Sequence, residues 1–370
     1  MEKKVSCIIL GTKAEYIKTF PLMLEMQRNK IPYIFIHTGQ HDLLDLCKIF
    51  GTKQPDVVLT SPPKKTTKFY AKTLKAVLWS FGLIFKIKKE VNKIKNLEYV
   101  YYHGDTITTA VAAIATSKLF NPFKEYKTVH LEAGLRSGDL TEPFPEEISR
   151  KIADGFSDIL LAVSNKARNN LKKERIKGKI IIVGNTIVDS AAIALKKAKK
   201  IKLPKKYAVV TLHRHENIKS KKRLERIISI LENLSIPFMF SLHDNTKKQF
   251  QHYGLLDRLK SIKKIKIIEN KNYADFIYLI SKATLILTDG GSMQEESLIF
   301  KKPCILLRKK TERQEGLRTQ INYLSELDLE KTKKKIDEYL EMKIPKFENP
   351  YGKTGVSKKI IKCLYQKRLH

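Results

Sequence analysis

Three carboxylates in the first half of the chain have the local setting of acid/base groups. Asp105 follows a short apolar run in the motif HGDT, Glu132 opens the motif EAGLR, and Glu146 begins a predicted helix after Pro145. A single carboxylate at such a position is often a helix cap or a first-turn acid. Three of them, each beside glycine, proline or arginine, predict a catalytic site in which one carboxyl donates a proton and another accepts it.

The second half of the chain contains a motif suited to a phosphate group. The sequence TDGGSMQEE, residues 288–296, runs from a predicted strand into a predicted helix. Gly290, Gly291 and Ser292 at the start of that helix would present free N–H groups to an anion, assisted by the helix dipole. Glu296, one turn further, is suited to bind both hydroxyls of a ribose, a combination common in nucleotide-binding domains.

The arginines gather near these motifs. The chain carries a net charge of +34, from 59 lysines and only 13 arginines against 38 acidic residues. Arginine is the better fork-shaped donor to phosphate and carboxylate, whereas lysine is a strongly hydrated surface cation. Six arginines lie in or beside the polar motifs: Arg136, Arg150, Arg214, Arg308, Arg313 and Arg318. The lysines are spread over both halves and form no stripe interleaved with aromatic residues, so we expect no nucleic-acid partner.

The elements that must position these residues alternate along the chain. Short apolar runs, typical of buried parallel strands, are separated by longer amphipathic stretches. The predicted strands are 5–10, 33–37, 56–59, 98–103, 127–131, 158–163 and 179–184, followed by 207–213, 237–243, 264–269, 284–288 and 303–308. The predicted helices of the first half are 14–28, 41–50, 67–95, 106–118, 146–154 and 165–174. This pattern predicts an α/β protein with two doubly wound Rossmann-like domains that face each other across a cleft at the carboxyl ends of both sheets.

Length and cysteine usage agree with this organisation. A chain of 370 residues is long enough for two domains with separate cores. The four cysteines are far apart in the sequence and predict buried free thiols rather than a disulfide framework or a zinc ribbon: Cys7, Cys47, Cys304 and Cys363. His37 and His41 flank a glycine that breaks any shared helix face, so we expect no metal site there.

No segment predicts a membrane span or a secretory signal. The longest apolar run, residues 76–85, is about half the length that a bilayer requires. It is better explained as a core-facing helix with lysines on its exposed side, although a helix lying on a membrane surface is the alternative. The first eleven residues have the character of a strand without a cleavage site. We expect a cytoplasmic protein without stable membrane insertion.

Together the motifs resemble those of the UDP-N-acetylglucosamine 2-epimerases, which have the glycosyltransferase-B fold. The resemblance runs from Gly11 to the C-terminus and rests on seven motifs in matching order: HGDT (103–106), EAGLRSGD (132–139), PFPEE (143–147), GNT (184–186), HR-x-EN (213–217), GG-x-x-QEE (290–296) and TER-x-EG (311–316). It implies an N-terminal domain over residues 1–186, a UDP-binding domain over 187–352, and a terminal helix, 353–370, that returns to the N-terminal domain.

The resemblance also implies a reaction and a site. The family inverts C2 of the sugar by eliminating UDP, which leaves a glycal-like intermediate, and by adding UDP back after a proton has returned to the opposite face. Carried over by position, the catalytic residues are Asp105, Glu132, Glu146 and His213. The substrate-binding residues are Lys13, Lys18, Arg136, Arg150, Arg214, His243, Asn245, Phe276, Gly290, Gly291, Ser292, Glu296 and Arg313. No metal or other cofactor is implied, and the family suggests a homodimer.

Several positions depart from the family pattern and keep alternatives open. Lys13 stands where the family usually has arginine, and Ser292 is displaced because the phosphate turn has the order DGGS instead of DSGG. Leu43 replaces a polar residue of the regulatory substrate site, which puts activation by the substrate in doubt. The alternatives are a hydrolysing epimerase that releases free N-acetylmannosamine, an epimerase of a modified UDP-sugar such as a diacetamido uronic acid, and a UDP-sugar glycosyltransferase of the same fold.

Overall fold

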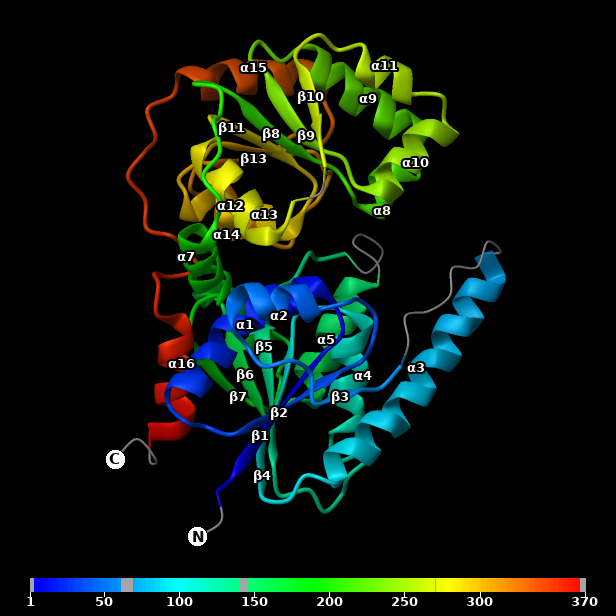
Figure 1. Ribbon diagram of the computed structural model, residues 1–370, viewed down its shortest axis with the longest axis vertical. Helices are drawn as coiled ribbons and strands as arrows, with labels where there is room; N and C mark the ends of the chain where they lie inside the picture. The colour runs from blue at the N-terminus through cyan, green and yellow to red at the C-terminus, as the bar shows by residue number, and fades with distance from the viewer. Residues whose placement is uncertain (1–2, 61–68, 140–144, 270, 367–370) are drawn as a thin grey trace. The chain divides into compact units, whose positions relative to one another are not determined.

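The computed structural model describes residues 3–60, 69–139, 145–269 and 271–366 (Figure 1). Pro143 and Phe144 of the PFPEE motif therefore lie outside the described residues. The chain divides into two compact units. The N-terminal unit contains residues 1–190 and 351–370, and the C-terminal unit contains residues 191–350.

The N-terminal unit is built on a parallel sheet. Its described residues form seven strands in the order β3-β2-β1-β4-β5-β6-β7, and all neighbouring strands are parallel. The strands are β1 (Val5–Leu10), β2 (Tyr33–His37), β3 (Val57–Val58), β4 (Leu97–His103), β5 (Lys127–Ala133), β6 (Ile159–Ala162) and β7 (Lys179–Ile182). The strand order reverses between β1 and β4. The carboxyl ends of these two strands are therefore a topological switch point, where open α/β sheets bind their ligands.

Helices connect the strands of this unit. They are α1 (Lys13–Arg28), α2 (Leu44–Phe50), α3 (Phe69–Asn92), α4 (Ile107–Ala115), α5 (Glu146–Phe156) and α6 (Asn165–Lys173). Helix α7 (Ile187–Lys197) follows the last strand and continues into the C-terminal unit, and α16 (Val356–Tyr365) ends the chain's described part. Helix α1 packs against α16, and α4 packs against both α3 and α5 (Figure 1). Thr12, Thr106 and Ser164 cap the starts of α1, α4 and α6 with their hydroxyl groups. These caps place each helix start directly after a strand, at the carboxyl edge of the sheet.

The C-terminal unit repeats this architecture. Its described residues form a six-stranded parallel sheet in the order β10-β9-β8-β11-β12-β13. The strands are β8 (Ala208–Thr211), β9 (Phe238–Ser241), β10 (Ile265–Ile268), β11 (Leu285–Thr288), β12 (Cys304–Leu306) and β13 (Asn322–Leu324). The helices are α8 (His215–Ile218), α9 (Lys221–Glu232), α10 (Asp244–His252), α11 (Leu256–Lys260), α12 (Tyr273–Lys282), α13 (Gly291–Ile299), α14 (Gln314–Leu317) and α15 (Leu329–Glu341). Here the strand order reverses between β8 and β11, so the switch point lies at the ends of these two strands.

The last helix belongs to the N-terminal unit. The carboxylate of Asp189 accepts the backbone N–H groups of Gly355 at 2.6 Å and Ser357 at 2.7 Å, at the start of α16. The backbone N–H of Asn185 donates to the carbonyl of Tyr351 at 2.9 Å. A negative charge at a helix N-terminus is stabilising, so these contacts hold α16 in place.

Most of the predicted elements are confirmed. Each predicted strand corresponds to an observed one, and both sheets are parallel and doubly wound. Strand β13 was not predicted, because its three residues, NYL, are too few to show a pattern. The expectation that all four cysteines are buried is wrong for Cys363, which is exposed on α16. No helix in the described part of the chain has the length and apolar character to cross a membrane.

Candidate active site

In the N-terminal unit, Arg150 of α5 joins the Asp105 turn to the start of its own helix. The guanidinium is buried and donates to Glu147 Oε2 at 3.0 Å and to Asp105 Oδ2. Glu147 also accepts the backbone N–H of Ser137 at 3.0 Å. Glu146, the first residue of α5, is half-buried. Charge-assisted bonds of this kind fix the position of both carboxylates, and the side chain of Asp105 is still 23% exposed and accessible to a ligand.

Glu132 occupies a bulge in β5. Its φ of 66° is in the left-handed region, and the register against β6 shifts between Leu131 and Ala133. A non-glycine residue in this conformation is strained, and such strain is common at functional sites. The carboxylate forms a buried ion pair with Lys18 of α1 and accepts a hydrogen bond from Asn185 Nδ2 at 2.8 Å. The bulge therefore turns the predicted acid toward the predicted cation Lys18 and toward the GNT motif.

A further buried network adjoins these two carboxylates. His130 of β5 has Nδ1 at 2.7 Å from Asp154 Oδ1 and Nε2 at 2.8 Å from the carbonyl oxygen of Gly104. Asp154 Oδ2 lies 2.8 Å from Arg136 Nη1. Arg136 also binds both carboxylate oxygens of Glu174, at 2.9 and 2.5 Å. The structure thus places Arg136, expected as a substrate ligand, in an ion-pair network with two carboxylates of its own unit.

The switch point between β1 and β4 contains an acid that the sequence-based site omitted. Glu15 accepts the backbone N–H groups of Gly11 and Thr12, both at 2.7 Å. It also accepts the hydroxyl groups of Thr106 and of Thr109, the latter at 3.0 Å. Burial raises the pKa of Glu15, and these hydrogen bonds oppose the rise. The signal for this residue is the capping box formed by Thr12 and Glu15, which the sequence shows.

His103, the last residue of β4, is fully enclosed. Burial lowers its pKa to about 3, so the imidazole is neutral at physiological pH. Its Nε2 has no hydrogen-bond partner within the described residues. The His103 ring, two residues before Asp105, therefore adds no positive charge to this turn.

Lys13 and Leu43, two of the positions that depart from the family pattern, differ in exposure. Lys13 is exposed at the start of α1, and its backbone N–H donates to His41 Nδ1 at 3.2 Å. Burial, with the neighbouring Lys13 charge, lowers the pKa of His41. Leu43 is buried. The Lys13 ammonium is thus available to an anion, whereas Leu43 is a packing residue of this region.

In the C-terminal unit, Asp289 organises the turn that carries His213. This buried carboxylate accepts the backbone N–H of His213 at 3.0 Å and that of Arg214 at 3.0 Å. It also accepts Asn217 Nδ2 at 3.1 Å. Asp289 follows β11 and His213 follows β8, so these bonds cross the switch point of this sheet. Asp289 was not assigned to the site from sequence, because its partners lie more than seventy residues away.

The two histidines of this unit lie side by side. The ring centroids of His213 and His243 are 5.6 Å apart in an edge-to-face arrangement. Burial lowers the pKa of both rings, and the nearby Asp289 carboxylate opposes this effect. The His213 side chain is nevertheless 46% exposed, so it can reach a ligand. Asn245, in the first turn of α10, is exposed.

The glycine turn at the start of α13 leaves no space for side chains. A Cβ on Gly290 would lie 3.0 Å from His213 Cε1, and one on Gly291 would lie 2.6 Å from Arg313 Nη1. Gly290 is the N-cap residue, and Ser292 is half-buried in the first turn. The two glycines therefore let a histidine and an arginine approach a helix N-terminus that favours anions.

Arg313 is buried within a group of opposite charges. Its Nε lies 2.9 Å from Glu295 Oε1, and it also pairs with Glu312. Glu312 pairs in addition with Arg308 at 3.1 Å and with Arg214 at 3.7 Å. Three arginines share two carboxylates, so the group carries a surplus of positive charge. Such a surplus beside a helix N-terminus is suited to a diphosphate.

The predicted nucleoside contacts lie on α12 and α13. The hydroxyl of Tyr273 donates to Glu296 Oε1 at 2.9 Å, and burial together with Glu296 raises the pKa of Tyr273. Phe276 follows three residues later on the same helix face and is partly exposed. Tyr273 was not assigned from sequence and fixes the carboxylate that was assigned to the ribose.

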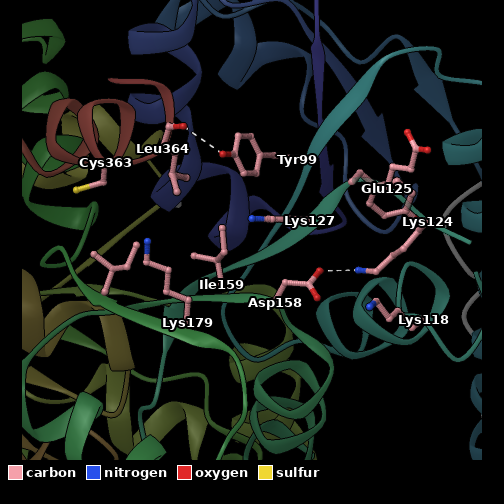
Figure 2. A pocket seen from close by; sticks show the side chains of 12 residues that line it. Tyr99, Lys118, Lys124, Glu125, Lys127, Asp158, Ile159, Lys179, Cys363 and Leu364 are labelled. Atoms are coloured by element: carbon pink, nitrogen blue, oxygen red, sulfur yellow. Dashed lines mark hydrogen bonds and ion pairs between the residues drawn. The ribbon is translucent and has the colours of Figure 1, made fainter. Parts of the chain in front are cut away.

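No predicted site residue lines the cavity drawn in Figure 2. This cavity of about 310 Å³ lies at the opposite, amino end of the N-terminal sheet. It includes Lys124, which donates to Asp158 at 2.6 Å, and Tyr99, which donates to the carbonyl of Leu364 at 3.1 Å. The described residues contain no group of three or more His, Cys, Asp and Glu side chains arranged to hold a metal ion.

The chain is similar to known proteins over nearly its full length. A family model described as UDP-N-acetylglucosamine 2-epimerase matches residues 24–365. The UDP-N-acetylglucosamine 2-epimerase of Methanocaldococcus jannaschii is 37% identical over 373 residues, which cover 96% of this chain and 98% of the relative. A crystal structure of the enzyme from that organism, in complex with UDP-GlcNAc and UDP, matches with a TM-score of 0.84 at 35% identity, covering 98% of this chain and 99% of the other.

A second kind of relative is also similar. The UDP-2,3-diacetamido-2,3-dideoxy-D-glucuronate 2-epimerase of Pseudomonas aeruginosa is 31% identical over 318 residues. The match covers 82% of this chain and 83% of that protein. The similarity therefore extends to epimerases whose names give different sugar substituents.

Proposed function

The chain belongs to the UDP-N-acetylglucosamine 2-epimerase family, and from this membership we propose that it interconverts UDP-N-acetylglucosamine and UDP-N-acetylmannosamine without releasing free sugar. The observation that carries the proposal is the pair of carboxylates at the ends of adjacent strands β4 and β5. Asp105 is held by Arg150 and Glu132 by Lys18. Two carboxyl groups held by cationic partners can exchange protons with a sugar ring if one accepts a proton and the other, protonated, donates one.

The chemistry explains why such groups are needed. The proton on C2 of the sugar is not acidic, because no carbonyl lies beside it. Cleavage of the C1–O bond first generates an oxocarbenium-like centre, and C2 then loses its proton to give the glycal-like intermediate. Carboxylates stabilise the developing positive charge and accept the proton. Return of a proton to the opposite face, with re-addition of UDP, completes the inversion.

We assign the acid/base and charge-stabilising roles to Asp105, Glu132 and Glu146. Lys18 would hold the Glu132 carboxyl group in place, and Arg150 would do the same for Asp105. Glu15 is already saturated by five donors. We therefore give Glu15 the role of fixing the switch-point turn, not that of a proton carrier. In this division residues 1–186 supply the acid/base groups.

Residues 187–352 would hold the nucleotide. The diphosphate is assigned to the N-terminus of α13, with Gly290, Gly291 and Ser292, and the ribose to Glu296. His213, poised by Asp289 and partly exposed, would assist the departure and return of UDP. Phe276 would stack on uracil. Arg214, His243, Asn245 and Arg313 would supply the remaining polar contacts, and Lys13, with its exposed ammonium, would contact phosphate.

The decisive experiment is incubation of the protein with UDP-N-acetylglucosamine in D2O, followed by NMR. We expect deuterium at C2 together with an isomerised UDP-sugar. Free N-acetylmannosamine with UDP would assign the protein to the hydrolysing branch. Absence of exchange would contradict the proposal for this substrate. The same incubation with the diacetamido uronic acid substrate named for the Pseudomonas relative then tests the modified-sugar alternative.

We further propose a cytoplasmic homodimer whose product enters cell-surface polysaccharide synthesis. Exposed apolar side chains support the dimer. Phe81 and Phe85 on α3 are 59% and 61% exposed, and Phe123 in the loop after α4 is 96% exposed. Contiguous exposed apolar side chains mark protein contacts, and Phe81 and Phe85 lie one turn apart on α3. Light scattering of the native protein and of F85D checks this: a dimer that dissociates on substitution is expected.

A further inference from the structure

His130 contacts two hydrogen-bond acceptors with its two ring nitrogens. Nδ1 lies 2.7 Å from Asp154 Oδ1, and Nε2 lies 2.8 Å from the carbonyl oxygen of Gly104. A carbonyl oxygen only accepts, and an ionised carboxylate also only accepts. Each nitrogen must therefore carry a hydrogen to make these bonds. A neutral imidazole has only one N–H, so both bonds together require the imidazolium form.

The charges around Asp154 agree with a cationic His130. Burial alone raises the pKa of Asp154, but His130 and Arg136 lower it below the ordinary value. Arg136 shares its single positive charge between Asp154 and Glu174. Glu174 also pairs with Lys151 at 3.7 Å, but both of these side chains are partly exposed. A positive charge on the His130 ring neutralises the Asp154 carboxylate, and both residues are 0% exposed.

The contacts of His130 reach both turns that carry the proposed acids. Gly104 immediately precedes Asp105, and its N–H donates to the carbonyl of Leu131 at 3.0 Å. The peptides on either side of Gly104 are thus held by β5. Asp154 Oδ2 lies 3.3 Å from the backbone N–H of Gly134, in the turn after Glu132. One ion pair therefore connects the turn before Asp105 to the turn after Glu132.

We propose that His130 is a positioning residue that donates from both ring nitrogens and locks the Asp105 and Glu132 turns at their mutual spacing. This inference rests on the proposed function, since it gives those two carboxylates the acid/base roles. His130 does not touch the substrate in this scheme. Its charge also lies close enough to His103 to disfavour protonation of that ring, in agreement with the lowered pKa of His103. The groups that face His130 are Asp154 from α5, Tyr102 and His103 from β4, and Arg136 through Asp154.

The charge state is tested on the native enzyme by NMR of ¹⁵N-labelled histidine, with His130 assigned from the spectrum of H130Q. We expect two slowly exchanging ring N–H groups for His130 at an alkaline pH at which free histidine is neutral. We expect D154N to lose one of them. A single N–H on His130 in the native enzyme would overturn the proposal, and this readout does not require catalysis.

The positioning role is tested by kinetics. A glutamine carries both of its amide hydrogens on one nitrogen, which cannot replace two separate ring nitrogens that bond to different acceptors, so H130Q should misplace the turns. We expect kcat to fall about 100-fold, the scale of a displacement of about 1 Å at a reacting centre, while the Kd for UDP keeps its native value. Y102F is the matched control. Its buried hydroxyl contacts Ser157 at 2.6 Å, and its loss leaves both His130 bonds in place, so native kcat is expected.

The outcomes distinguish a failure of the proposed function from a failure of the role proposed for His130. If the native protein incorporates no deuterium at C2, the proposed function fails, whereas the NMR result still decides the charge of His130. If the native protein is active and H130Q retains native kcat, the positioning role is wrong. An equal loss of kcat in H130Q and Y102F would identify a general packing effect and would also overturn it.

Discussion

The carboxylate of Asp289 accepts the backbone N–H of His213 at 3.0 Å across the switch point of the C-terminal sheet. A side chain from one strand end thereby sets the conformation of the turn at the neighbouring strand end. His213 keeps nearly half of its side chain exposed. The rigid backbone and the accessible ring together suit the role proposed for His213, assistance to the departure of UDP.

This relationship predicts the effect of D289N. The amide keeps the size of the side chain but offers only one acceptor oxygen to the three donors in the His213 turn. We expect kcat to fall about 100-fold because the ring is displaced, with a smaller change in KM. Steady-state kinetics checks this. A larger effect on KM than on kcat would show that Asp289 acts mainly in binding.

D105N tests the acid/base assignment. The asparagine keeps a polar contact to Arg150 but cannot accept a proton, so turnover should fall at least about 100-fold. Binding of UDP, measured by calorimetry, should remain native.

D158N is the matched control for D105N. Asp158 is also paired with a basic side chain, that of Lys124, but it lies at the amino edge of the same sheet. Turnover of D158N should remain native. Weakened UDP binding with normal turnover in D105N would reassign that residue to the nucleotide site.

The Tyr273 hydroxyl offers a test of the ribose site. Y273F removes the donor at 2.9 Å from Glu296 and leaves the carboxylate in place. We expect KM to rise about 10-fold, corresponding to about 1.4 kcal/mol, while kcat changes little. E296A should raise KM further. A loss of kcat in Y273F without a change in KM would contradict the binding role of this pair.

The buried His103 makes stability depend on pH. Its pKa is lowered to about 3 in the folded state, whereas an unfolded histidine titrates near pH 6.5. Below about pH 6.5 the unfolded chain binds the proton and the folded chain does not, so acid destabilises the fold by up to about 1.4 kcal/mol per pH unit. H103Q removes this contribution.

Urea titrations measure this effect. We expect the free energy of unfolding to fall more between pH 7 and about pH 5 in the native protein than in H103Q. Equal losses in the two proteins would show that the enclosed ring does not carry the effect.

The strands and helices were predictable from the sequence, whereas the hydrogen bonds between side chains on different elements were not. Alternation of apolar runs located strands such as β1 and β5, and the glycine turns located the helix starts. The partners of Asp154 and Asp289 were not predictable in this way, because their hydrogen bonds depend on strand order. The same limit applies to Arg136. As an arginine beside a polar motif it was expected to contact the substrate, and its ion pairs with Asp154 and Glu174 depend on the fold. The local capping box of Glu15, in contrast, was readable from four consecutive residues.

The contact between Asp189 and the start of α16 has a consequence for how the chain is assembled. The chain leaves the N-terminal unit after Ser190 and re-enters it at Tyr351, and Asn185 is hydrogen-bonded to Tyr351 at 2.9 Å. Exit and entry are therefore neighbours on one scaffold, and residues 191–350 have the topology of a cassette inserted into a host domain. A short linker in place of that cassette should give a self-contained host, and a relative's nucleotide-binding cassette can be exchanged at the same two junctions.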